Sequence, residues 1–217
     1  MSAAPVTVAF PPIPTLAVVP DAPRALAAEA RRIHAESVRY WSAYSLDEFF
    51  RRPAPEVWAP ADQVRHLTRS VRAVNKGLSL PRPVLLVLFG WSRQPSRAFD
   101  VLLADYKAAL AAGGRAGRFA PPAVGATEQT AEGRARIMSH HASAIDEFAR
   151  AIEQRFERGL DRYRLPHPLL GKLTVREMVY FTLLHNVHHV QVAERRRVGG
   201  SAARTEESTN RSRPGND

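Results

Sequence analysis

Residues 174–197, TVREMVYFTLLHNVHHVQVAERRR, decide the fold. One face of this stretch repeats at the spacing of an α-helix, through Met178, His185, His189 and Val192. Thr174 and Glu177 stand three residues apart where that pattern begins, which is the arrangement of a capping box at a helix start. The sequence therefore predicts a long helix that begins at Thr174 and ends near Arg197, before Gly199-Gly200.

Three further stretches carry the same period, at about 22–50, 60–80 and 128–157. Asp21 is a candidate N-cap for the first of them. No segment alternates with the two-residue period of a strand, so we expect an all-α protein, a four-helix bundle. The long connection 81–127 contains an extra helix at about 96–112 and has the length of a crossover between neighbouring helices that run parallel.

The composition limits what the chain can be. Its 217 residues, 45% of them apolar, suffice for one domain with a buried core, and the absence of cysteine excludes disulfide scaffolds, cysteine-ligated zinc and thiol nucleophiles. We expect an extended Pro-rich arm at 1–20, the bundle domain at 21–198 and a disordered basic tail at 199–217. The longest apolar run, 84–91, is too short to span a membrane, and no signal peptide is evident, so we expect a cytoplasmic protein.

The chain carries a formal net charge of +10, part of it in the arginine-rich tail. Arg65, Arg69 and Arg72 recur on one face of the second expected helix. A solvated helix face explains such a pattern better than a nucleic-acid footprint, because no helix-turn-helix, zinc-finger or RNA-binding signature accompanies it.

The histidines are the residues most suited to chemistry. His185 and His189 lie one helical turn apart, within about 40° of each other, so they can bind one divalent ion or form a hydrogen-bonded pair in the core or at an interface. His66, beside the apolar stripe of the second helix, is the best candidate for a third ligand. His141 lies on the stripe of the third helix, where a hydrogen-bonded core residue is favoured over a fourth ligand. His188 points about 100° away from His189, where it can either support the ligands from behind or lie against a neighbouring helix. Three others are expected outside the site: His34 and His140 at the surface, and His167 in the turn before the last helix.

Two stretches carry a resemblance to a known family. Residues 58–67, WAPADQVRHL, place a Trp before a His-Leu pair on a helix. Residues 166–178, PHPLLGKLTVREM, lead into the His-x-x-His-His pattern of 185–189. Together, in this chain order, the two motifs resemble those of the DinB-like superfamily, and the resemblance covers roughly residues 22–197.

The resemblance implies a four-helix bundle with a three-histidine divalent metal site, which in this chain is formed by His66, His185 and His189. Members of the family bind zinc or nickel. Some resemble S-transferases that join bacillithiol or mycothiol to electrophiles, and others resemble maleylpyruvate isomerases or metal-dependent hydrolases. Because the chain has no cysteine, S-transfer would need a low-molecular-weight thiol as co-substrate. The long 81–127 insertion and the basic tail depart from the family pattern.

Three functions follow from these patterns. The first is a metal-dependent enzyme, a thiol-cofactor S-transferase or a hydrolase, that acts on a small molecule. The second is a non-catalytic bundle in which the metal joins two helices, in a homodimeric, stress-related protein. The third, ranked lowest, is a basic protein associated with nucleic acid. Glu177, two turns before His185, is either the capping residue or a general base, and the capping role is favoured.

Overall fold

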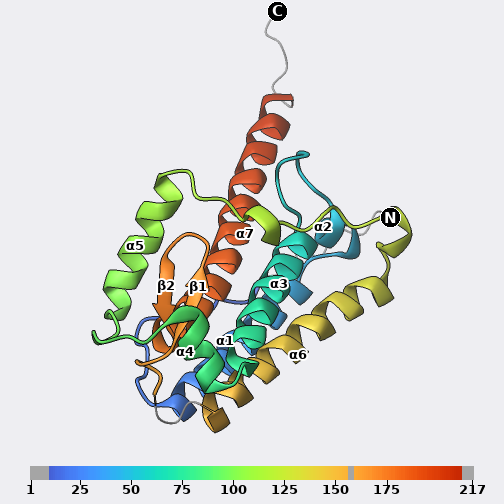
Figure 1. Cartoon of the computed structure of the whole chain (residues 1–217). Coiled ribbons are helices and arrows are strands. Elements are labelled where there is room, and N and C mark those ends of the chain that lie inside the picture. Colours follow the sequence, from blue (N-terminus) through green and yellow to red (C-terminus); the bar gives the residue numbers. More distant parts are fainter. Residues whose placement is uncertain (1–9, 156–158, 212–217) are drawn as a thin grey trace, which may run out of the picture.

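The computed structural model describes residues 10–155 and 159–211, with side chains described for residues 10–154 and 159–199. Four long helices form a bundle: α1 (Pro23–Ser42), α3 (Pro60–Ser79), α6 (Ala131–Arg155) and α7 (Val175–Arg211). Each packs against two of the others, because α6 contacts α1 and α3, and α7 contacts the same two helices from the other side (Figure 1). The expected all-α four-helix bundle is therefore confirmed.

The crossover joins two helices that run in the same direction. In Figure 1, α3 and α6 both run downward, whereas α1 and α7 run upward. The connecting segment returns across the bundle through α4 (Arg82–Phe89), α5 (Phe99–Ala111) and two short 3₁₀ turns, η1 (Gly117–Phe119) and η2 (Ala126–Glu128). The crossover thus holds two helices rather than the one expected, because the apolar run is itself helical, with Leu85 buried in the core.

Two helix starts differ in how well the sequence specified them. The capping box of α7 is confirmed, since the Thr174 amide donates to Glu177 and the Glu177 amide donates to the Thr174 hydroxyl. The N-cap of α1 is Ala22 and not Asp21 as expected. The Asp21 carboxylate instead accepts a hydrogen bond from the Tyr180 hydroxyl, 2.9 Å away on α7.

The helix expected over 22–50 is broken in two. α1 ends at Ser42, and α2 (Leu46–Phe50) follows with its own capping box between Ser45 and Glu48. Helical spacing continues through the break, but the serine hydroxyl and the Glu48 carboxylate satisfy the free amides of a new helix start. The capping box therefore allows a separate helix to begin at Leu46.

A small hairpin corrects the expectation that the chain has no strands. β1 (Arg164–His167) pairs antiparallel with β2 (Gly171–Thr174), directly before α7. Each strand has only four residues, and Leu165–Leu173 is the one cross-strand pair in which both residues are buried. The alternation of buried and exposed residues is therefore too short to detect in the sequence. The His167 ring closes the turn, because its Nδ1 accepts hydrogen bonds from the amides of Leu169 and Leu170.

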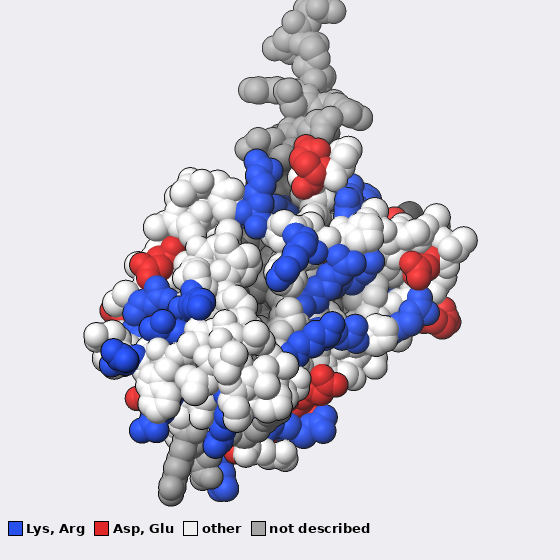
Figure 2. Space-filling view, in the orientation of Figure 1, with Lys and Arg blue, Asp and Glu red and all other residues white. Residues whose placement is uncertain are grey.

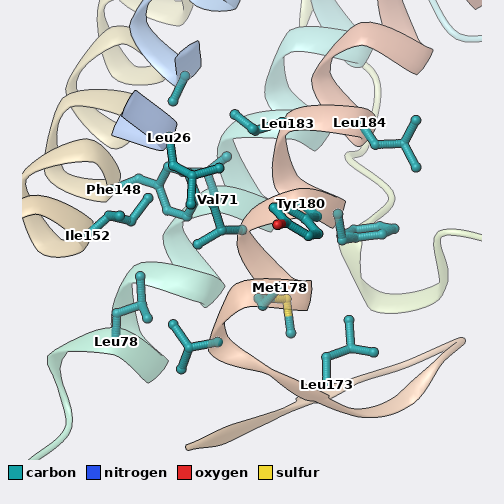
Figure 3. Packing of buried hydrophobic residues seen from close by; sticks show 14 of the residues in the cluster. Leu26, Val71, Leu78, Phe148, Ile152, Leu173, Met178, Tyr180, Leu183 and Leu184 are labelled. Carbon is teal, nitrogen blue, oxygen red and sulfur yellow. The ribbon is translucent and has the colours of Figure 1, made fainter. Parts of the chain in front are cut away.

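The main core lies where the bundle meets this hairpin. Figure 3 shows Leu26, Phe148 and Ile152 packed near Val71 and Leu78 of α3, with Leu173 of the hairpin beneath Met178 of α7. A second cluster of buried side chains lies toward the other end of the bundle: Tyr40, Trp41, Tyr44, Phe49, Phe50, Ala61, Val64, Val190 and Ala193. The metal-ligand candidates on α3 and α7 lie close in sequence to both clusters, so rigid packing fixes their backbone positions.

The ends of the chain are described only in part. Residues 10–20 of the expected arm form no helix or strand, and Phe10 packs on the rings of Tyr40 and Tyr44. Residues 1–9 and 212–217 lie outside the described residues. α7 extends to Arg211, past the end expected near Arg197, and the disorder expected for the tail stays a prediction. Among the described helices, none combines the length and apolar character needed to cross a membrane.

Candidate metal centre

The bundle brings together three histidines that are distant in the sequence. His66 comes from α3, and His185 and His189 come from consecutive turns of α7. The Nε2 atom of His185 lies 3.1 Å from that of His66 and 2.9 Å from that of His189. Metal–nitrogen bonds of about 2.1 Å place two nitrogens of one ion about 3 Å apart. The three rings are therefore spaced as ligands of a single ion would be.

Hydrogen bonds at the far side of two rings decide which nitrogens face the centre. The Nδ1–H of His66 donates to the backbone carbonyl of Phe119, 3.1 Å away, and the Nδ1–H of His189 donates to the side-chain oxygen of Gln63. A neutral imidazole that donates through Nδ1 carries a lone pair on Nε2. The Nε2 of His185 can donate only one proton, so it cannot satisfy both neighbours, whereas a cation would satisfy all three lone pairs. The residues present thus fit a divalent metal ion.

Burial keeps these ligands in the form that binds metal. Loss of solvent lowers the pKa of His66, and it lowers the pKa values of His185 and His189 well below the usual range. All three imidazoles are therefore neutral at neutral pH, as ligation requires. The Trp58 ring stacks on His189 at 6.2 Å between centroids, and Phe181 stacks on His185 at 5.1 Å, so an aromatic ring packs against each of these two imidazoles.

The three histidines lie in the wall of a large cavity. This cavity has a volume of about 870 Å³ and runs between α3, α5, α7, the hairpin and residues 114–120 of the crossover. Much of its lining is apolar, and its cationic side chains are Lys76, Arg115, Arg118 and Arg196. A small molecule that enters the cavity can therefore reach the point where the three Nε2 atoms converge.

The sequence model of the DinB superfamily matches residues 29–193. The chain belongs to the DinB superfamily. No curated protein and no solved structure matches it significantly. The match includes α3 and the histidine-bearing turns of α7, so the whole three-histidine cluster lies within the DinB region.

The other histidines of this DinB-superfamily chain lie outside the cluster. His141 is buried and its Nε2 donates to the Asn186 side-chain oxygen, 3.1 Å away, so the favoured interpretation as a hydrogen-bonded core residue is confirmed. His140 is exposed as expected, but His34 is half-buried, because its ring packs edge-on against His141 at 5.2 Å. His188 packs against Tyr106 of α5, which confirms that its flank meets a neighbouring helix.

Glu177 has no part in the cluster. It accepts hydrogen bonds from the Thr174 amide and from the backbone and side chain of Arg97, and it does not line the cavity. These contacts lower the pKa of Glu177 against the opposing effect of its burial. The capping role favoured from the sequence is thus confirmed, and the alternative of a general base is wrong.

Three contributors to the site could not be read from spacing. Gln63 precedes His66 by one turn, so helical geometry places it nearby, but its bond to His189 depends on how α3 and α7 pack. The carbonyl of Phe119 comes from the crossover, where no sequence signal marks it. Tyr106 of α5 has its ring against His185 and His188 and lines the cavity, and its place there depends on how α5 packs against α7.

Proposed function

We propose that this DinB-superfamily protein is a metal-dependent enzyme that joins a low-molecular-weight thiol to an electrophile. The observation that carries the proposal is the convergence of three histidine nitrogens at the wall of a large cavity. Structural zinc sites are usually closed by four protein ligands, whereas catalytic sites keep a position for substrate. Three ligands beside a cavity match the catalytic type. Zinc and nickel both accept imidazole, and these are the ions we propose.

When bound, a divalent ion supplies positive charge that lowers the pKa of a thiol or a water beside it. His66, His185 and His189 hold the ion without adding negative charge, because each imidazole is neutral. Burial raises the pKa of Tyr106 to about 12, so its hydroxyl keeps its proton and can donate a hydrogen bond to a molecule in the cavity.

The cavity lining supports a thiol as the nucleophile. Because the chain has no cysteine, the thiol must come from a small molecule. Four cationic side chains and one acidic one, Glu56, line the cavity, which favours a thiol that carries carboxylates. Val74, Leu110 and Phe181 offer an apolar wall for the electrophile. Water in place of the thiol would give hydrolysis, for which the cationic lining has no evident use.

The proposed reaction needs no oxidant or reductant. The thiol S–H bond breaks and the proton passes to solvent. The sulfur then forms a bond to the electrophilic carbon, and the bond between that carbon and its leaving group breaks, so that the leaving group departs with the electron pair. The cavity holds the two reactants together, which replaces a bimolecular encounter with a reaction between bound groups.

Metal analysis and turnover together test this function. Mass spectrometry of the purified parent should find about one zinc or nickel per chain, and a His66→Ala/His185→Ala/His189→Ala variant should hold none while remaining helical. His34→Leu, a histidine change away from the cavity, is the matched control and should keep its metal. The parent and the control should consume bacillithiol, mycothiol or glutathione in the presence of an aryl chloride. No metal in the parent, even after soaking with zinc or nickel, would contradict the proposal.

A second candidate is a metal cross-link without catalysis. An ion bound to His66 of α3 and His185 of α7 would join two neighbouring helices of the bundle. In that case chelation should lower the melting temperature while no thiol or electrophile is consumed. The cavity beside the three histidines favours the enzyme, since a cross-link alone does not need one.

We also propose a homodimer. Val87 and Leu88 of α4 are 83% and 55% exposed, and burial of such apolar side chains between two copies would be favourable. Light scattering behind a sizing column measures the mass directly. A mass of one chain would contradict the dimer without bearing on the metal site.

A further inference from the structure

A second cavity lies outside the metal centre, on the face where α3 and α6 lie side by side. Its volume is about 240 Å³, and α3, α6 and part of the crossover form its walls. Figure 2 shows Lys and Arg side chains gathered over this part of the surface. Four of the residues that line the cavity are arginines: Arg65, Arg69, Arg72 and Arg136. Glu128 is the one carboxylate among the described lining residues.

Neighbouring carboxylates neutralise only part of the charge of this cavity. Arg136 lies 3.5 Å from Glu128, and Arg65 lies 3.8 Å from the buried Asp62. Among the described residues, no carboxylate oxygen lies within 4 Å of the Arg69 or Arg72 guanidinium. Like charges gathered in a concave site raise the local concentration of ions of opposite sign. The cavity is therefore suited to an anion.

Two of the guanidinium groups are held in place by the crossover. Arg65 donates to the carbonyl of Pro122 at 2.6 Å, and Arg69 donates to the carbonyl of Ala120 at 2.8 Å. A guanidinium has five N–H donors, so each group keeps others for a ligand. Because these two side chains are already fixed, they lose less conformational entropy when an anion binds than mobile arginines would.

The wall opposite α3 is also closely packed. Gly133, in the first turn of α6, lies so near the preceding loop that an added Cβ would overlap the carbonyl of Glu128. The loop therefore closes against α6 and gives the cavity a fixed edge. A volume of about 240 Å³ corresponds to roughly eight water molecules, enough for one or two phosphate groups but not for a length of duplex.

We propose that this cavity binds the phosphate group of a small phosphorylated molecule. Arginine pairs with phosphate through two parallel hydrogen bonds, which gives strong and directional binding. The solvated helix face expected for Arg65, Arg69 and Arg72 is thus one wall of a binding site. A nucleic-acid backbone would instead need a row of separate phosphate contacts along the surface.

Calorimetry with inorganic pyrophosphate tests the site. The parent should bind it with one-to-one stoichiometry, and Arg72→Gln/Arg136→Gln should bind at least tenfold more weakly. Neither arginine hydrogen-bonds to the crossover carbonyls, so the circular dichroism spectrum should stay unchanged. The matched control is Arg24→Gln/Arg39→Gln, which removes the same charge from exposed positions of α1 and should bind as the parent does.

Pyrophosphate can also contact a metal ion, but both double variants retain the three histidines, so any such contribution is equal in all three proteins. Equal affinities in the three proteins, or no binding by the parent, would overturn the proposal. A parallel titration with a 20-nucleotide duplex tests whether the arginines bind the phosphate backbone of a nucleic acid instead of a small molecule. Tighter binding of the duplex than of pyrophosphate, lost in Arg72→Gln/Arg136→Gln, would assign the arginines to nucleic acid and overturn the proposal as well.

Discussion

Two groups of histidines pack against α7 and differ in what their nitrogens meet. In the metal centre, the Nε2 atoms of three rings converge, and two of the Nδ1 groups donate to fixed oxygens. In the second group, His141 hydrogen-bonds to Asn186, and its ring lies against His34. The Nδ1 atoms of His34 and His141 are both buried without a hydrogen-bond partner.

Burial by itself therefore does not distinguish a metal site from a group of histidines that only packs in the core. Loss of solvent lowers the histidine pKa values in both groups, and neutral imidazoles result in both. What differs is direction: lone pairs that point at one centre cannot satisfy one another, whereas a cation can satisfy them all. Access differs too, because, of these two groups, only the metal centre lines the cavity of about 870 Å³.

The largest expected effect comes from removing the metal. An ion present at a thousand times its Kd stabilises the fold by about 4 kcal/mol, or about 10 °C in Tm for a chain of this size. Chelation should therefore lower the Tm of the parent and of His34→Leu by that amount. The triple histidine variant should not respond, and a response of the same size there would place the ion elsewhere.

Acid should also act through the second group, because burial lowers the pKa of His141 to about 3. The unfolded chain binds this proton near pH 6.5, so stability is intact above that pH and is lost as the pH falls toward 3. Both proteins are compared without metal. Between about pH 7.5 and 4.5, the free energy of unfolding of His141→Gln should fall by about 3 kcal/mol less than that of the parent. Urea titrations at the two pH values measure the difference, and parallel losses in both proteins would contradict it.

Gln63→Leu makes the metal centre more like the second group, because it removes the oxygen that accepts the Nδ1–H of His189. Loss of such a supporting hydrogen bond lowers metal affinity by about 10- to 100-fold. Gln63→Glu keeps an acceptor oxygen and should bind nearly as tightly as the parent. Competition with a zinc chelator of known affinity compares the three proteins, and equal affinity of Gln63→Leu and the parent would show that the bond has no role.

The smallest effect is expected for His34→Leu. His34 has a buried nitrogen without a hydrogen bond, so an apolar residue of similar size removes an unsatisfied group. The free energy of unfolding should change by less than about 1 kcal/mol, and metal content should not change. A loss several times larger would mean that His34 contributes to the core in a way its contacts do not reveal.

The bundle could be predicted from the sequence because its signals are local. Helical periodicity located α3, α6 and α7, and the Thr174–Glu177 box fixed the start of α7. The hairpin and α4 could not be predicted, because neither shows a recognisable periodicity. Four-residue strands are too short to show a period, and the apolar residues of α4 gave no polar face by which to recognise a helix.

The sequence by itself determined that His185 and His189 share one side of a helix, because their spacing is set by the α-helical turn. Only the tertiary structure decided the rest. His66 lies 119 positions before His185, and its distance from the pair depends on how α3 packs against α7. The oxygen of Gln63 reaches His189 through the same packing of α3 against α7. The Phe119 carbonyl and the arginine cavity depend on how the crossover closes over α3. Helical spacing acts within one turn of the chain, whereas convergence of side chains from separate elements is a property of their packing.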